Sequence, residues 1–115
     1  MAFGFGVGVN ERHIENVQEY LIEGEVVEQV YGLVVDFIAL TNKRVIFVDK
    51  IIGFKNTSVT SIPYSKIESI SIENGKALSF SNEIEIVTKH KAYVLKFVKG
   101  ADVVGFYKSL TKHIC

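Results

Sequence analysis

The chain of 115 residues has the length of one domain, and 48% of its residues are hydrophobic while 23% are charged. This composition excludes a disordered chain and is typical of a globular protein that holds a core of its own. Thirteen Lys and Arg balance thirteen Asp and Glu, which argues against a nucleic-acid-binding protein because those are usually strongly basic. We therefore expect one domain over residues 1–115.

The balanced net charge hides a difference between two parts of the chain. Residues 1–42 contain one basic and seven acidic side chains, whereas residues 43–115 contain twelve basic and six acidic ones. Such asymmetry can steer a partner or let copies of the same chain attract each other. Alternatively, a β-rich fold interleaves distant segments and mixes the charges on one surface. The sequence leaves both interpretations open.

The two ends of the chain lack the pattern of a targeting signal, so we expect no signal peptide and no membrane anchor. Residues 1–9 are apolar and glycine-rich, lack a basic start, and are too short to cross a bilayer, which takes about 20 residues. Their glycines do not have the spacing of a nucleotide-binding loop. The only cysteine, Cys115, cannot form an internal disulfide, so nothing indicates secretion. We expect a cytoplasmic protein whose residues 1–9 form a flexible or extended arm that packs on a neighbour.

A short helix is predicted near the start of the chain. Asn10 is a suitable N-cap, and Ile14, Val17 and Leu21 recur at helical spacing. Gly24 is expected to end this helix, because glycine adopts the left-handed conformation without a steric penalty.

From Glu25 onward, alternating and β-branched residues predict about seven strands. Their expected ranges are 26–31, 34–41, 44–49, 58–62, 66–73, 83–88 and 92–98. Thr41-Asn42-Lys43 suits a hairpin turn, Pro63 should end the fourth strand, and Asn74-Gly75 is the strongest turn signal.

The chain closes with an amphipathic helix that begins at Gly100 or Asp102. Its apolar stripe consists of Val103, Phe106, Tyr107, Leu110 and Ile114. Gly105 within it costs about 1 kcal/mol relative to alanine and suggests a close approach to a strand or a neighbour. The whole order predicts a mainly β fold, a barrel or sandwich with one open end covered by the last helix.

Three segments together resemble the bacterial pleckstrin-homology-like domains. They are the run DFIALTNKRVIFVD at residues 36–49, SIPYSKI at residues 61–67, and Gly100-Ala101-Asp102 with the helix that follows. The resemblance covers nearly the whole chain after the first helix. It implies a strongly bent, seven-stranded antiparallel barrel capped by a C-terminal helix. It also implies self-assembly into rings of identical copies and a protein with no assigned ligand. In eukaryotic relatives one open end binds phosphoinositide headgroups, and other surfaces bind proteins.

The chain departs from those relatives at two points. Lipid-binding members carry basic residues around the first hairpin, whereas residues 13–42 contain neither Lys nor Arg, which argues against phosphoinositide binding. The eukaryotic helix usually carries a tryptophan. This chain has none, and we expect Phe106 to take its place in the core.

Catalytic and metal-binding patterns are weak. His13, His90 and His113 fall in a helix, a turn and the chain end, without partners at ligand or triad spacing. Glu83 and Glu85 alternate with isoleucines, as on a solvated strand face. We therefore predict that the protein is not an enzyme and binds no metal or cofactor.

The candidate contact residues lie in two loops, which the resemblance places near the same open end of the barrel. They are Lys50, Ile51, Ile52, Phe54 and Lys55 after the third strand, and Lys89, His90 and Lys91 before the seventh. One interpretation is a tip whose apolar residues insert into a membrane or partner while its lysines meet anionic groups. The other is that Ile51 and Phe54 fold back onto the barrel rim.

Two functional hypotheses follow from these features. The first is a non-enzymatic interaction module that self-associates into a homo-oligomer, because the charges are split and exposed strand edges must be covered or paired. The alternative is a module that binds anionic membranes peripherally. A separate protein partner remains compatible with either, and a nucleic acid is not expected.

Overall fold

The structure, a computed structural model, describes residues 11–34, 36–50, 57–73 and 83–115. The elements in chain order are α1 (Glu11–Gln18), β1 (Val27–Gly32), β2 (Asp36–Thr41), β3 (Arg44–Lys50), β4 (Thr57–Pro63), the 3-10 helix η1 (Tyr64–Lys66), β5 (Ile67–Glu73), β6 (Glu83–Thr88), β7 (Ala92–Lys96) and α2 (Val103–Ile114). All seven expected strands are present, each within two residues of its predicted ends. The residue 1–9 arm and the Asn74-Gly75 turn lie outside the described residues.

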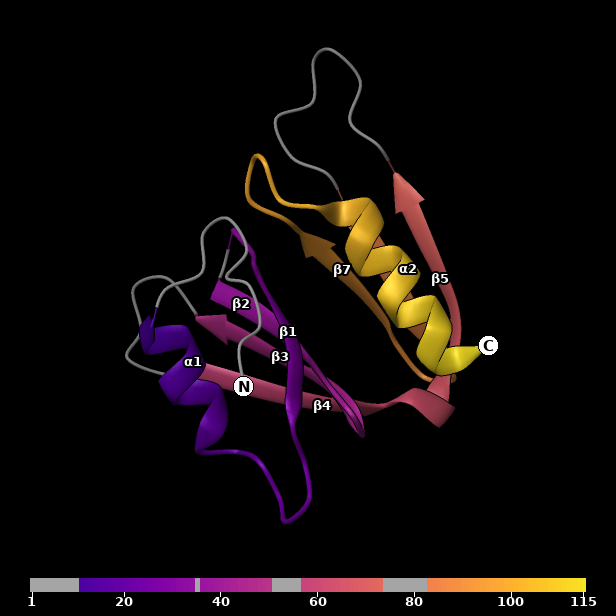
Figure 1. The fold of residues 1–115 in the computed structure, drawn as a ribbon. Coiled ribbons are helices and arrows are strands. Elements are labelled where there is room, and N and C mark those ends of the chain that lie inside the picture. The colour runs from indigo at the N-terminus through magenta and orange to yellow at the C-terminus, as the bar shows by residue number, and fades with distance from the viewer. Residues whose placement is uncertain (1–10, 35, 51–56, 74–82) are drawn as a thin grey trace.

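The strands form two antiparallel sheets, one in the order β1-β2-β3-β4 and the other in the order β5-β6-β7 (Figure 1). η1 leads from the first sheet into the second. The sheets meet again at an isolated bridge between Leu33 and Phe97, which the amide of Val34 extends by donating to the carbonyl of Lys96. The closed barrel that the resemblance implied is therefore two sheets joined at their corners.

The main core lies between the two sheets and α2. The helix contributes Val103, Phe106 and Leu110, all buried. Phe106 is fully buried, and its ring lies 5.1 Å from the rings of both Phe97 and Tyr31. These contacts place the expected apolar stripe of α2 on the core, with Phe106 at its centre.

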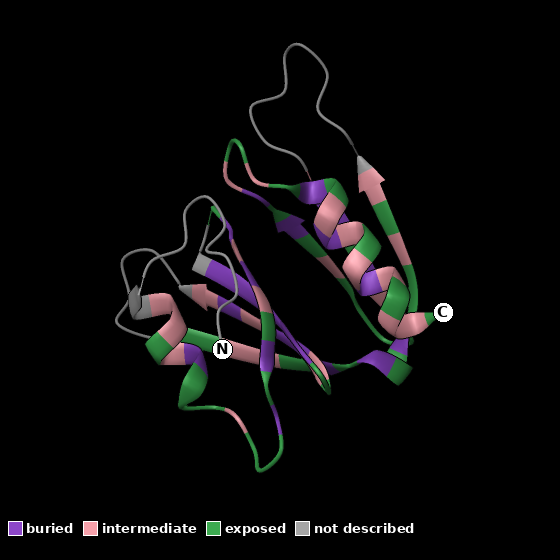
Figure 2. Cartoon of the chain, in the orientation of Figure 1, coloured by how far each residue is buried: buried purple, intermediate pink, exposed green. Residues whose placement is uncertain are grey.

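A second core lies on the outer face of the first sheet, where α1 packs. Val17 of α1 is fully buried there, next to side chains from all four strands of that sheet. Residues of β2 therefore alternate between two cores: Ile38 and Leu40 face the main core, whereas Phe37 and Ala39 face the second. Burial on both faces explains why β2 and β3 are almost continuously apolar, and Figure 2 shows β2 buried along its length while β5 alternates.

The ends of the first helix differ from the prediction. α1 ends at Gln18, and 3-10-type hydrogen bonds carry the chain on to Leu21. Gly24 does have a positive φ, of 79°, but it lies in the turn before β1 and does not end the helix. The loop after Leu21 is held by contacts with Arg44, described below, so the helix does not continue to Gly24 although the helical spacing predicted it. The expected N-cap, Asn10, lies outside the described residues.

The start of α2 is as expected. Asp102 is the N-cap, and its carboxylate accepts a hydrogen bond of 3.0 Å from the amide of Gly105. A Cβ on Gly105 would clash with the carboxylate of Asp102. The close approach at Gly105 is therefore to the cap of its own helix.

Candidate functional site

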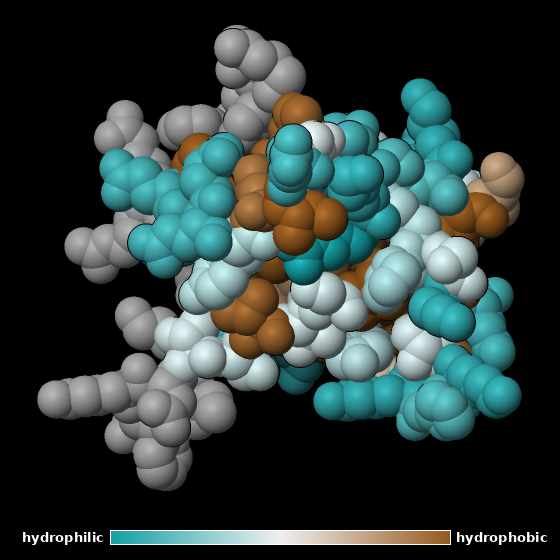
Figure 3. Space-filling view, turned by 90° about the horizontal axis from the view of Figure 1, so that it is seen from below, coloured by the Kyte–Doolittle hydropathy of each residue, from teal (hydrophilic) through white to brown (hydrophobic). Residues whose placement is uncertain are grey.

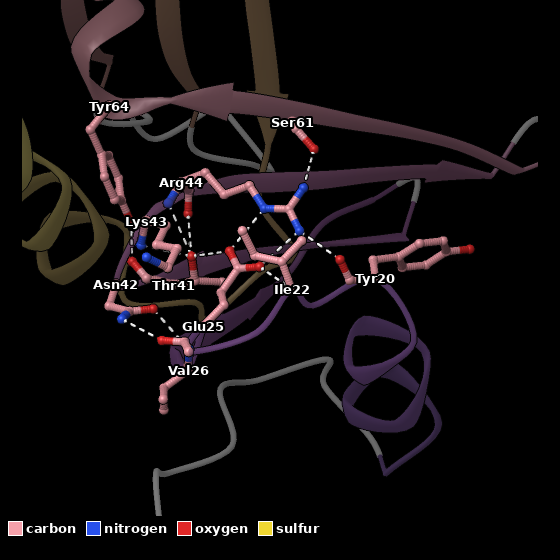
Figure 4. A network of polar contacts seen from close by, with 11 residues as sticks. Tyr20, Ile22, Glu25, Val26, Thr41, Asn42, Lys43, Arg44, Ser61 and Tyr64 are labelled. Carbon is pink, nitrogen blue, oxygen red and sulfur yellow. Dashed lines mark hydrogen bonds and ion pairs between the residues drawn. The ribbon is translucent and has the colours of Figure 1, made fainter.

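The motif Thr41-Asn42-Lys43-Arg44 forms the turn between β2 and β3 and fixes the loop that joins α1 to β1 (Figure 4). Thr41 Oγ1 accepts hydrogen bonds of 3.0 Å from the amides of Lys43 and Arg44, which tightens the turn. The Asn42 side chain accepts from the amide of Val26 and donates to the carbonyl of Gly24. The side chain of Thr41 therefore braces this turn, and that of Asn42 ties it to the chain at Gly24 and Val26.

An ion pair between the buried Glu25 and the partly buried Arg44 lies at the centre of this network. Arg44 donates from Nε to Glu25 Oε2 and from a terminal nitrogen to Glu25 Oε1, both at 2.8 Å. Glu25 is 7% exposed and also accepts from the hydroxyl of Thr41 and the amide of Ile22. The Arg44 hydrogen bonds, opposed by burial, lower the pKa of Glu25 from 4.5 to about 2. The pair is thus ionised at neutral pH, with hydrogen bonds on both carboxylate oxygens.

The same guanidinium joins two further parts of the surface. One terminal nitrogen of Arg44 donates to the carbonyl of Tyr20 on the α1–β1 loop, at 2.6 Å. The other donates at 2.6 Å to the hydroxyl of Ser61 on β4. The loop and this part of β4 are therefore held side by side (Figure 4).

This clamped loop presents apolar side chains to solvent. Tyr20, Ile22 and Val26 are 41%, 59% and 48% exposed, and we name these three residues the loop patch. The exposed carboxylate of Glu19 directly precedes Tyr20 in the sequence, and that of Glu23 directly follows Ile22. Figure 3 views the molecule from this end and shows hydrophobic residues at the surface between hydrophilic ones. Large exposed apolar side chains on a rigid frame are typical of an interaction surface.

Next to the loop lies a groove with basic side chains, which we name the basic groove. It has a volume of about 220 Å³ and is lined by Ser61, Ile62, Pro63, Lys66, Thr88, Lys89, His90 and Tyr93. The pairing of Ile67 with Thr88 brings the β6–β7 turn against η1, so that Lys66 and Lys89 share one groove although they are distant in sequence. None of these lining residues is acidic, so the groove suits an anionic group beside an apolar one.

A second groove of about 220 Å³ continues past Tyr93. Its lining includes Asp49 at the end of β3, Ser58 at the start of β4, and the residues from Lys91 to Val94. The ammonium group of Lys91 lies 4.8 Å from the centre of the Tyr93 ring, within the range of a cation–π contact. Tyr93 therefore lines both grooves, and each groove has at least one lysine in its lining.

The structure places the candidate contact residues unequally. Lys89, His90 and Lys91 are exposed on the β6–β7 turn, and the first two line the basic groove. Lys50 is the last residue of β3 and pairs with Thr57. Ile51, Ile52, Phe54 and Lys55 lie outside the described residues.

Sequence reasoning missed Lys66 and Tyr93 as groove residues. Lys66 lies in η1, which was expected to begin a strand, and Tyr93 was counted only as a strand residue. No spacing pattern links either residue to the β6–β7 turn, because strand pairing alone brings them together. Sequence reasoning also missed the contacts by which Asn42 and Arg44 hold the α1–β1 loop, which we name the clamp, although the motif Thr41-Asn42-Lys43-Arg44 was recognised.

His113, near the end of α2, contacts β1 and η1. Its ring stacks on Tyr64 with centroids 4.1 Å apart, and its Nε2 lies 2.7 Å from a carboxylate oxygen of Glu28 on β1. The hydroxyl of Tyr64 donates to the carbonyl of Thr41, and burial raises the pKa of that hydroxyl well above its usual range. His113 therefore has a structural role.

Two other features bear on catalysis and membranes. Glu85 is exposed on the outer face of the second sheet, opposite Val94 and near Glu83, in a shallow hollow. Across the described ranges, no three His, Cys, Asp or Glu side chains gather where they could hold a metal ion. Within the same ranges, no helix has the length and hydrophobicity needed to cross a membrane.

Two packed antiparallel sheets with a C-terminal helix over their core define a pleckstrin-homology-like fold. Two solved structures share it. One is a pleckstrin homology domain from Shewanella amazonensis, with a TM-score of 0.74 and 25% identity over 90% of this chain and 96% of that one. The other is a DUF1696 family protein with a pleckstrin-homology domain from Shewanella loihica. Its TM-score is 0.77, with 24% identity over 98% of this chain and all of that one.

The sequence comparison identifies the family itself. The model of the bacterial PH domain matches residues 7–114, and the chain belongs to this family. Two uncharacterized proteins of Bacillus subtilis are similar along most of their length. YozO is 35% identical over 101 residues, which cover 88% of this chain and 89% of YozO. YjqA is 42% identical over 100 residues, which cover 85% of this chain and 71% of YjqA.

Proposed function

We propose that this protein is a non-enzymatic interaction module that binds further copies of itself through the loop patch and its surroundings. The observation that carries the proposal is the exposure of Tyr20, Ile22 and Val26 on a loop that the Glu25–Arg44 ion pair holds in place. A loop fixed in advance loses little conformational entropy on binding, and apolar anchors supply most of the affinity at protein interfaces.

The distribution of charge favours another copy of the chain as the partner. The loop patch is flanked by the exposed carboxylates of Glu19 and Glu23, whereas the basic groove presents Lys66 and Lys89. Surfaces of opposite charge on one molecule attract copies of that molecule and accelerate their encounter. The net charge of zero adds no overall repulsion between copies.

The native mass in solution tests this proposal. Light scattering on a sizing column should give a mass of more than one chain at micromolar concentration, and Ile22→Ser with Val26→Ser should lower it. Assembly should persist at high salt if the apolar contacts dominate, because salt screens only the charged ones. A wild-type protein that elutes as a monomer under both conditions would overturn the proposal.

Binding to anionic membranes is a second candidate. Lys66, Lys89 and Lys91 are all exposed at the same end of the molecule, around the β6–β7 turn. Near an anionic surface each lysine contributes about 1 kcal/mol. Vesicles rich in phosphatidylserine should carry the protein in flotation, and vesicles of phosphatidylcholine should not.

The matched variants for this assay reverse two charges at different places. Lys89→Glu with Lys91→Glu should abolish flotation. Lys108→Glu with Lys112→Glu, which changes two exposed lysines of α2, should reduce it far less. Equal losses in both variants would point to net charge alone and would refute a site at the turn.

A further inference from the structure

We infer that the open edge of β7 is a docking site for an extended segment of another protein, in which apolar residues precede acidic ones. The segment would add to the second sheet as a strand antiparallel to β7, along the second groove and into the basic groove. Strand addition to an exposed sheet edge is a general mode of peptide recognition. The inference goes beyond self-association and does not depend on it, because it uses neither the loop patch nor another copy of the chain.

The hydrogen-bond alternation of an antiparallel pair shows which backbone groups of β7 point away from β6. The amide of Thr88 donates to the carbonyl of Lys91, so these two residues form a hydrogen-bonded pair at the β6–β7 turn. Because bonded and non-bonded pairs alternate along the strands, Tyr93 bonds to β6, whereas Ala92 and Val94 do not. The N–H and C=O groups of Ala92 and Val94 therefore point to the outer edge of β7.

The end of β1 uses part of this edge and then leaves it. The carbonyl of Lys96, the next residue in the same alternation, accepts a hydrogen bond of 2.9 Å from the amide of Val34. Asp36 already begins β2, which belongs to the first sheet. In the described part of the chain, no strand pairs with the outer edge of β7 at Ala92 and Val94. A segment antiparallel to β7 would therefore continue the line of β1 along an open edge.

The open edge borders the second groove. Ala92 and Val94 belong to the lining of this groove. The first sheet supplies its other side through Phe47, Ser58 and Thr60. Its volume of about 220 Å³ lies below the ~300–1,000 Å³ that is usual for sites of small-molecule ligands. The groove therefore suits the side chains of a paired strand, of which every second one would face the first sheet.

The charges along β7 determine the order of residues in the bound segment. A segment antiparallel to β7 runs from Val94 toward the β6–β7 turn. Its first residues would meet the second groove, whose lining includes the carboxylate of Asp49. Its last residues would pass Lys91 and reach Lys66 and Lys89 in the basic groove, where no lining residue is acidic. Apolar residues are therefore favoured first and carboxylates last.

The backbone edge favours a peptide over a lipid headgroup as the occupant. Exposed lysines attract either kind of anion. Only another polypeptide can pair with the N–H and C=O groups of Ala92 and Val94 in a strand ladder. The hydrogen exchange of these two amides with solvent therefore distinguishes strand addition from headgroup binding.

A peptide library tests the inference. Phage that display random peptides are selected on the immobilised protein, and the enriched sequences should place apolar and β-branched residues before Asp or Glu. A synthetic peptide of the enriched sequence, blocked at both ends, should then slow hydrogen exchange at the amides of Ala92 and Val94, as measured by nuclear magnetic resonance. The exchange of the Tyr93 amide, which already bonds to β6, should change little.

Two variants separate the backbone contact from the charges, with dissociation constants measured by fluorescence anisotropy of the labelled peptide. Val94→Pro removes an edge N–H without removing a bond to β6, and it should weaken peptide binding about tenfold. Lys66→Glu with Lys89→Glu leaves the edge unchanged and should weaken binding at least about tenfold. Lys108→Glu with Lys112→Glu on α2 changes the net charge equally and should bind the peptide as the wild type does.

Three outcomes would overturn the inference. If no sequence is enriched, the edge is not a docking site, and binding to anionic vesicles would then assign the grooves to a membrane. If a selected peptide binds without slowing exchange at Ala92 and Val94, it does not add to β7. If Lys66→Glu with Lys89→Glu binds the peptide as tightly as the α2 control, the basic groove does not hold its acidic end.

The remaining outcomes leave the inference decidable. Should circular dichroism show that Val94→Pro is unfolded, the exchange measurement and the lysine variants still decide. A wild-type protein that is a monomer overturns the proposed self-association and leaves this inference as it stands.

Discussion

Replacing Glu25 by glutamine should destabilise the protein by an amount that depends on pH. The pKa of Glu25 is lowered from 4.5 to about 2, chiefly by the hydrogen bonds from Arg44. A carboxylate whose pKa falls on folding contributes stability above its unfolded pKa and loses it as the pH falls toward its folded pKa. The contribution should therefore be complete above about pH 5 and should decline from there toward pH 2.

The size of the effect follows from the shift. Each pKa unit corresponds to about 1.4 kcal/mol, so a shift from 4.5 to about 2 gives about 3 kcal/mol at pH 6. At pH 3 about 1 kcal/mol of this remains, because the unfolded carboxyl is by then almost fully protonated. Glutamine cannot ionise, so the difference in free energy of unfolding between wild type and Glu25→Gln should shrink by about 2 kcal/mol between pH 6 and pH 3.

Urea denaturation followed by far-ultraviolet circular dichroism at pH 6, 5, 4 and 3 measures this difference. Glu23→Gln provides the control, since Glu23 is an exposed carboxylate on the same loop, and its effect should be small at every pH. If the Glu25→Gln difference does not change between pH 6 and pH 3, the ion pair does not stabilise the fold as the geometry indicates.

Two further predictions concern α2. Gly105→Ala should leave stability almost unchanged, because the gain of about 1 kcal/mol in helix propensity is offset by a similar loss at the Asp102 cap. In an Asp102→Ala background the same change should stabilise the protein by about 1 kcal/mol. Equal effects in both backgrounds would refute a clash between the new Cβ and the Asp102 carboxylate. His113→Ala should lower the free energy of unfolding by about 1–2 kcal/mol, since it removes the stacking on Tyr64 and the contact with Glu28. His113→Phe should restore part of that loss in thermal denaturation, whereas a loss as large as that of the alanine variant would show that stacking contributes little.

The strands were predictable from the sequence because their signals are local. Alternation such as that of Ile84 and Ile86, and breakers such as Pro63, act within a few residues of chain. The apolar stripe of α2 and its Asp102 cap were predictable for the same reason. The end of α1 was predicted wrongly, because Glu25 and Arg44, which lie 19 residues apart, fix the loop that follows Gln18.

The candidate site was only partly predictable. The basic turn of Lys89, His90 and Lys91 was visible as a cluster in the sequence. Its groove was not, because Lys66 and Tyr93 reach it through the pairing of β5 with β6 and of β6 with β7. The loop patch could not be recognised in the sequence either. Ile22 and Val26 are residue types that also form the core, and only their exposure in the structure distinguishes them.

The sequence by itself determined the order of the strands and the two α-helices, the strand ends to within two residues, and the family, since short-range periodicity and turn chemistry specify these. The tertiary structure alone decided that α1 covers the outer face of the first sheet and that the strands form two sheets rather than a closed barrel. It also decided that the T-N-K-R motif is a clamp and that an acidic, apolar loop lies beside a basic groove. These features depend on contacts between residues far apart in the chain, and such contacts leave no local pattern in the sequence.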